Sequence, residues 1–168
     1  MTATSPAGRS SPWQHVWIHT ASVLTVATVI ASWFLRQPGY APLRAVGPLL
    51  GLSAILLMFL PIMTLRKHGD AEPGGSYMES TRVVERGPFA IVRHPQYLGY
   101  ILLCGTFALT SQHWLIIALA MLATFCFSMH AVREERLLVA KFGKEYLAYM
   151  ARVPRFNIVR GVLRVLRQ

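Results

Sequence analysis

Two clusters of polar residues mark the ends of one long apolar stretch. The first is Arg93-His94-Pro95-Gln96-Tyr97-Leu98-Gly99, and the second is Arg133-Glu134-Glu135. Ionisable groups at the depth of a membrane are costly, and they are usually retained because they pair with one another or bind a ligand. Together the clusters supply guanidinium, imidazole, carboxylate and aromatic groups, a combination that indicates a binding site.

The apolar stretch between the clusters predicts a hairpin of two helices. No Lys, Arg, Asp or Glu occurs from Pro95 to Val132. This is too long for one membrane span of about 20 residues, so we expect a break at the polar segment 110–113. Antiparallel helices pack about 8 to 10 Å apart, which would bring the two clusters face to face.

The spacing leaves two interpretations of the facing clusters open. His130 and Glu134 are four residues apart and share a helical face, which would place both in a common pocket with His94. Alternatively, an ion pair from Arg93 to Glu134 or Glu135 only locks the hairpin. A metal site is not expected, because one His-x-x-x-Glu pair and scattered histidines do not form a ligand set.

Further apolar runs predict an all-α integral membrane protein with about four transmembrane helices. The chain is 54% hydrophobic and only 14% charged. Uncharged runs cover Val16–Leu35 and Ala45–Leu65, and the hairpin provides two more spans. We expect the last two spans to form a tight hairpin, followed by a cytosolic amphipathic C-terminal helix.

The distribution of positive charge predicts the orientation. The net charge is +10, but it is concentrated in the loop before the hairpin and in the segment after it, while the hairpin tip has none. Such an excess is typical of cytoplasmic loops and makes nucleic-acid binding an unnecessary explanation. We expect the site and both termini on the cytosolic side of a bacterial inner membrane.

The chain therefore divides into four predicted parts. Residues 1–14 form a disordered N-terminus, 15–66 two transmembrane helices, 67–92 a cytosolic loop, and 93–168 the hairpin with its C-terminal segment. The loop is either a linker or a flap over the site. In the C-terminal segment, 158–166 alternates apolar residues with arginines, which indicates a surface-lying anchor.

The polar motifs resemble those of one enzyme superfamily. They are Gly87-Pro88-Phe89, the Arg93 to Gly99 cluster, Glu134-Glu135, and Phe142-Gly143-Lys144-Glu145-Tyr146 with Tyr149. Their order and spacing are similar to those of the isoprenylcysteine carboxyl methyltransferase and phospholipid methyltransferase superfamily of integral membrane enzymes. The resemblance covers roughly residues 82–156.

The resemblance implies methyl transfer from S-adenosylmethionine to a lipid-like acceptor at the membrane surface. It implies that one Glu of the pair takes part in catalysis, for which we take Glu134, and that a C-terminal cation, Arg152 or Arg155, orients the acceptor. A proline that commonly follows the latter position is missing here, which leaves the acceptor open. The cofactor-binding residues that the resemblance implies are His94, Pro95, Tyr97, Gly99, Glu134, Glu135 and Tyr146. The positions of Arg93 and His130 in the facing clusters add these two residues to the predicted site.

The chemistry of this donor suits the residues. A carboxylate of the Glu pair can bind its ammonium, while Arg93 or His94 can bind its carboxylate. Tyr97 and Tyr146 offer ring faces to the adenine or the sulfonium. The acceptor that the resemblance implies is an isoprenylcysteine-type carboxylate or another small lipid. The alternatives are a phospholipid N-methyltransferase, a nicotinamide-dependent sterol-type reductase and a non-catalytic scaffold.

Overall fold

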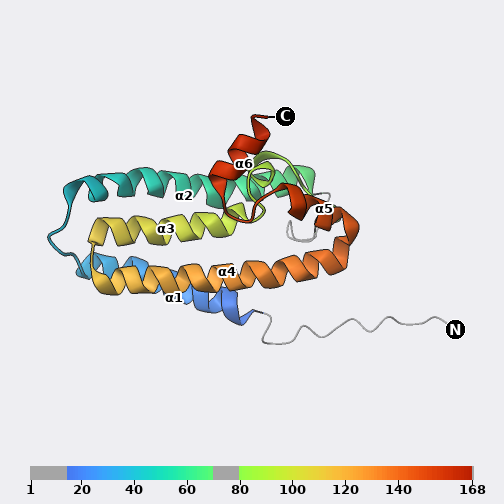
Figure 1. Cartoon of the computed structure of the whole chain (residues 1–168). Coiled ribbons are helices and arrows are strands. Elements are labelled where there is room, and N and C mark those ends of the chain that lie inside the picture. Colours follow the sequence, from blue (N-terminus) through green and yellow to red (C-terminus); the bar gives the residue numbers. More distant parts are fainter. Residues whose placement is uncertain (1–14, 70–79, 168) are drawn as a thin grey trace.

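The computed structural model describes residues 15–69 and 80–167, which form helices joined by short connections. The predicted all-α class is confirmed, and no strand occurs in these ranges. The long helices lie side by side, and the shorter elements gather at one end of them (Figure 1). The helices are α1 (Val16–Phe34), α2 (Ala41–His68), η2 (Gly87–Ala90), α3 (Pro95–Ser111), α4 (Trp114–Phe142), α5 (Lys144–Arg152) and α6 (Ile158–Val165).

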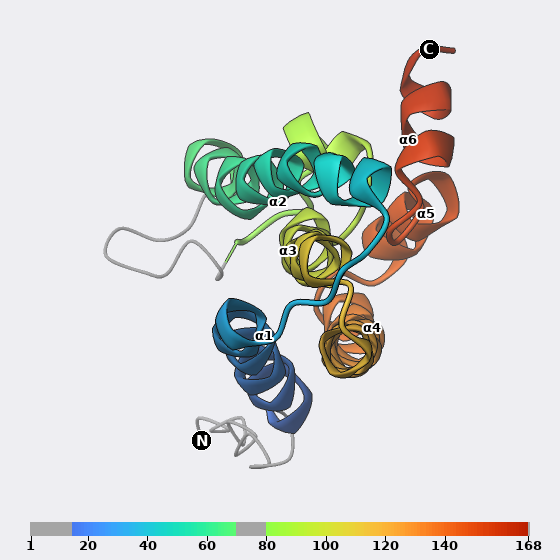
Figure 2. The same cartoon turned by 90° about the vertical axis from the view of Figure 1, so that its left-hand side faces the viewer.

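Helix α3 lies at the centre of the bundle. Seen along the helices, α2 covers one side of α3, while α1 and α4 lie on the other side (Figure 2). Helix α3 contacts all three of these neighbours. The first polar cluster, Arg93 to Gly99, is therefore at the end of the most enclosed helix.

Among the described residues, three helices are long and apolar enough to cross a membrane: α1, α2 and α4. Helix α3 has 17 residues, fewer than the roughly 20 that cross the hydrocarbon core. The predicted total of four spans therefore stays a prediction. Large apolar side chains such as Val23, Phe59 and Met121 are exposed on the outer faces, as a lipid environment requires.

The predicted hairpin is confirmed, and its second arm is longer than expected. The turn consists of Gln112, with a positive φ of 49°, and His113, whose Nδ1 accepts a hydrogen bond of 3.2 Å from the backbone of Leu115. This bond caps the start of α4. Helix α4 then continues ten residues past Val132 to Phe142, so Glu134 and Glu135 project from a continuous helix.

The predicted C-terminal amphipathic helix is divided into two. Gly143 adopts a positive φ of 57° between α4 and α5, a conformation that glycine reaches without steric strain. Helix α6 follows after a short connection. The predicted disorder of residues 1–14 and the middle of the predicted 67–92 loop lie outside the described residues.

Close packing between α2 and α3 depends on small residues. A Cβ atom on Gly99 would lie 3.0 Å from the backbone oxygen of Ala54 and from the backbone nitrogen of Met58. A Cβ on Gly47 would lie 2.4 Å from the side chain of Thr110. Small residues are a common means for membrane helices to approach one another closely. Gly99, a predicted cofactor residue, therefore faces α2.

Substitution of Gly99 by Ala should force α2 and α3 apart, because backbone atoms cannot move aside as a side chain can. We expect a loss of about 1 to 3 kcal/mol in stability, measured as a lower thermal unfolding midpoint in detergent. Gly105→Ala is the matched control, since its Cβ would meet only the end of the Leu50 side chain, at 3.2 Å. Equal midpoints for the two variants would contradict this account of the helix contact.

Candidate functional site

The two polar clusters meet at one end of the bundle, as the hairpin predicted. This end also holds the N-terminus of α1, the C-terminus of α2 and helix α5 (Figure 1). The Nδ1 atom of His94 lies 3.5 Å from Oε2 of Glu134, and its Nε2 atom lies 3.2 Å from Oε1 of Glu135. The end of α4 and the start of α3 thus form one polar centre.

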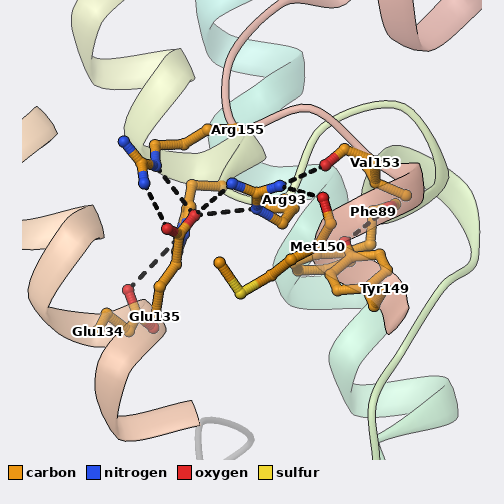
Figure 3. A network of polar contacts seen from close by, with 9 residues as sticks. Phe89, Arg93, Glu134, Glu135, Tyr149, Met150, Val153 and Arg155 are labelled. Carbon is orange, nitrogen blue, oxygen red and sulfur yellow. Dashed lines mark hydrogen bonds and ion pairs between the residues drawn. The ribbon is translucent and has the colours of Figure 1, made fainter. Parts of the chain in front are cut away.

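The most buried part of this centre is the Glu135 cluster, which consists of Arg93, His94, Glu135 and Arg155. Both carboxylate oxygens of Glu135 are used (Figure 3): Arg93 Nε and Arg155 Nε lie 2.9 Å from Oε1, and an Arg155 terminal nitrogen lies 2.5 Å from Oε2. The expected hairpin-locking ion pair is therefore present between Arg93 and Glu135. Since both of its oxygens already have cationic partners, Glu135 has little capacity left for a ligand.

Arg93 also fixes the C-terminal segment to the start of α3. One of its terminal nitrogens donates to the carbonyl oxygens of Met150, at 2.8 Å, and Val153, at 2.5 Å (Figure 3). Its backbone N–H donates to Pro154, at 3.0 Å. Arg93 thus has mainly a structural role, because its guanidinium N–H groups bond to other residues of the protein.

Within the Glu135 cluster, the buried His94 also contacts an aromatic side chain. Its ring stacks on Tyr97, with centroids 5.5 Å apart and planes at 13°. Burial lowers the pKa of His94, but the hydrogen bonds and charges of Glu134 and Glu135 outweigh it and raise the pKa above its ordinary value. This shift favours the imidazolium form, whose two N–H groups both face carboxylates.

A first cavity of about 190 Å³ lies beside this centre. Its walls are the segment 80–89, the start of α3, the end of α4 and α5. The segment 80–89 therefore forms part of the cavity wall, and the Tyr149 hydroxyl holds it there by donating to the Phe89 carbonyl at 2.8 Å. The interpretation of the loop as a flap stays a prediction. The lining residues are Leu65, Ser80, Arg82, Val83, Val84, Phe89, Arg93, His94, Pro95, Gln96, Tyr97, Glu134, Leu138, Phe142, Tyr146 and Tyr149.

A second cavity of about 830 Å³ lies between α1, α3 and α4. Apolar side chains of α1, such as Ile18 and Val26, form part of its wall, and Arg133 and Arg136 line it as well. Three residues, Gln96, Tyr97 and Glu134, line both cavities. The two spaces therefore adjoin at these side chains.

Two buried polar atoms at this boundary form no hydrogen bond within the described part of the chain. They are Nδ1 of His130 and Oε2 of Glu134, which faces His94 at the 3.5 Å given above. The His130 ring meets the Tyr97 ring edge-on, at 5.3 Å and 71°. A buried polar atom without a partner costs about 1 to 3 kcal/mol, so these atoms are candidates for contact with a ligand.

The remaining predicted residues are distributed unevenly around the cavities. Pro95 and Tyr146 line the first cavity, and His130 lines only the second. Arg152 forms an exposed ion pair of 2.6 Å with Glu85, and Arg155 belongs to the Glu135 cluster; neither lines these cavities. Their predicted role in orienting an acceptor stays a prediction.

Sequence reasoning missed the contribution of α1. His15, just before α1, and Ile18 and Ser22 within it line the second cavity, but this mostly apolar helix has no polar motif that could have marked it. Leu138, Phe142 and Tyr146 line the first cavity together, and their spacing of four residues already indicated that they share one face.

Removing the charge of Glu135 should destabilise the protein strongly. Glu135→Gln leaves Arg93 and Arg155 without their buried counter-charge, a change that costs about 3 to 5 kcal/mol. The matched control is Glu85→Gln, which breaks the exposed pair with Arg152 and should cost at most about 1 kcal/mol. Thermal unfolding in detergent measures both. A similar small shift for both variants would contradict the structural role of Glu135.

Comparison with known proteins gives one match. No curated protein and no solved structure matches the chain. Residues 43–145 match the phospholipid methyltransferase family, a region that runs from the start of α2 into α5 and includes both polar clusters. Helix α2, whose sequence is marked only by its hydrophobicity, is thus part of the matched region. The chain belongs to the phospholipid methyltransferase family, within the superfamily of membrane methyltransferases that its motifs resemble.

Proposed function

We propose that this membrane protein transfers a methyl group from S-adenosylmethionine, bound in the first cavity, to a lipid-like acceptor in the second. The observation that carries the proposal is the shared boundary, where Tyr97 and Glu134 line both spaces. A soluble donor and a lipid acceptor need separate entrances and a common meeting point. Family membership supports methyl transfer over the nicotinamide-dependent reductase and the scaffold.

The residues of the first cavity fit the donor. Glu134 has a carboxylate oxygen without a hydrogen bond and can bind the ammonium, whereas Glu135 is already satisfied. Tyr97 and Tyr146 supply ring faces, and burial raises the pKa of Tyr146, so its hydroxyl stays neutral. Such rings attract a cation or stack on adenine.

Donor binding requires the first cavity to open further. Its 190 Å³ is less than the roughly 300 to 1,000 Å³ of common small-molecule sites. The part of the wall best able to yield is residues 80–85, which has no helix or strand. We propose that this segment moves outward to admit the donor and then covers it, which excludes water from the reacting groups.

The second cavity fits an amphipathic acceptor. Its apolar wall includes Ile18, Val26 and Phe127, while Arg133 and Arg136 can approach an anionic group. An isoprenylcysteine-type carboxylate or another small lipid is compatible with these contacts. The fixed cavities would align acceptor and methyl group for in-line displacement, and such positioning supplies much of the rate in reactions of this kind.

One observation favours an amine among the acceptors. The Nδ1 atom of His130 forms no hydrogen bond within the described residues and can accept one, and an ammonium supplies donors. An ammonium must lose a proton before its nitrogen can attack the methyl carbon, and His130 is placed to take it. A phospholipid amine is therefore the second candidate acceptor, with the positions of Arg133 and Arg136 suited to its phosphate.

Calorimetry on detergent-purified protein tests the donor site. We expect binding of S-adenosylmethionine in the micromolar range and no binding of NADPH. Glu134→Gln should weaken binding about tenfold or more, because it removes a charged hydrogen-bond partner. Glu145→Gln, the same change on the exposed face of α5, should have no effect. Binding of NADPH alone would overturn the proposal.

A pair of tyrosines gives a second comparison in the same assay. Tyr97→Ala should weaken donor binding about fivefold or more, because a ring face near the cation is lost. Tyr100→Ala should leave it nearly unchanged, since Tyr100 stacks on Phe127 and lines only the second cavity. Equal losses would contradict the assignment of the first cavity to the donor.

The acceptor is tested with His130→Phe, which keeps an aromatic ring and removes both nitrogens. We expect donor binding within about twofold of the original, and methyl transfer to phosphatidylethanolamine vesicles about 100-fold slower, as loss of a proton acceptor predicts. Part of the rate should return at high pH, where the amine loses its proton to water. An undiminished rate with the amine, or an equal loss with a farnesylated cysteine carboxylate, would contradict the amine acceptor.

A further inference from the structure

Helix α6 lies across the bundle rather than along it. Figure 1 shows α6 roughly perpendicular to the long helices, near the end where α3 begins, and Figure 2 shows it running along one side of the bundle. If the long helices cross a membrane, this direction is parallel to the membrane surface. The position is that of an interfacial helix.

Two stripes of side chains run along α6. Val159, Leu163 and Leu166 follow one another at spacings of four and three residues, and all are exposed, at 69%, 48% and 77%. The arginines at 160, 164 and 167 repeat the same spacing one residue further on, so the basic stripe lies beside the apolar one. An exposed apolar stripe beside a basic stripe is typical of helices that lie on anionic membranes.

A hollow of about 670 Å³ lies along these stripes, and we call it the basic hollow. None of the six residues that line it is acidic. The Nε atom of Arg164 is buried and has no hydrogen-bond partner in the described part of the chain. The lining residues are Asn157, Val159, Arg160, Leu163, Arg164 and Arg167.

We propose that the basic hollow binds the phosphate headgroup of an anionic membrane lipid, with the acyl chains against Val159 and Leu163. Guanidinium groups bind phosphate oxygens through paired charge-assisted hydrogen bonds, and three of them converge here. The neighbouring apolar side chains would serve no purpose for a free phosphate ion. The lipid therefore explains both stripes, whereas a soluble anion explains only one.

This surface is joined to the wall of the first cavity. A Cβ atom on Gly161 would lie 2.0 Å from the carbonyl oxygen of Ile91, so the backbone of α6 rests directly on that residue. Arg164 also donates a hydrogen bond to the carbonyl of Ala90. Ile91 is two residues before Arg93, and a lipid bound at α6 would hold the C-terminal segment against the Glu135 cluster.

Native mass spectrometry of the full chain in detergent tests the lipid site, with phosphatidylglycerol and phosphatidylcholine titrated separately. We expect phosphatidylglycerol to bind more tightly, and the double variant Arg160→Gln, Arg167→Gln to lose about fivefold for each arginine. Arg164 is left intact because it bonds to Ala90. The matched control is Arg36→Gln, Arg44→Gln, which removes two charges at the opposite end of the bundle and should leave binding unchanged.

The possible outcomes separate this proposal from the methyltransferase proposal. Equal binding of both lipids, or equal losses in the two double variants, would overturn the lipid site. Displacement of the lipid by inorganic phosphate at matched concentration would do the same, because it would show an anion site without selectivity for a membrane. Since lipid retention is read directly, a failure to bind S-adenosylmethionine would leave this result intact.

Discussion

The structure depends on one buried charge. Glu135 is almost fully enclosed, and such a carboxylate is stable only when its counter-charges and hydrogen bonds are all supplied. Arg93 and His94 supply them from the start of α3, and Arg155 supplies them from the C-terminal segment. Three separate parts of the chain are therefore held at one point, and two of them, the start of α3 and the part of α4 around Glu134, line both cavities.

Adjacent glutamates have different surroundings because successive residues on a helix point about 100° apart. Glu135 points into the Glu135 cluster, whereas Glu134 points to the boundary of the two cavities, where its side chain is 37% exposed. The structural demand on the first residue leaves the second one available for a ligand. Two adjacent glutamates that the sequence does not distinguish therefore differ in position: Glu135 holds the polar cluster together, and Glu134 lines the cavities.

Much of the fold could be predicted because its signals are local. The uncharged runs gave the long helices, and the polar residues at 110–113 gave the hairpin that brings His94 to Glu134. The rest depends on tertiary contacts. The approach of α2 makes Gly99 a packing residue, and the pairing of Arg152 with Glu85 draws that side chain away from the cavities. Helix α1 lines the second cavity through isolated residues such as Ile18 and Ser22, which no motif marks. Side-chain direction at such positions is set by neighbours that local spacing does not reveal.

The turn and the body of the hairpin differ in the changes of length that they can accept. The Gln112-His113 turn lies at the far end from the site, so extra residues there would leave the polar contacts in place. Inside α4, one inserted or deleted residue between the turn and Glu134 would rotate everything after it by a quarter turn or more and present the wrong carboxylate to Arg93. Natural insertions and deletions in this helix should therefore be close to whole turns, that is three, four or seven residues long, because only these keep Glu135 on the side that faces Arg93.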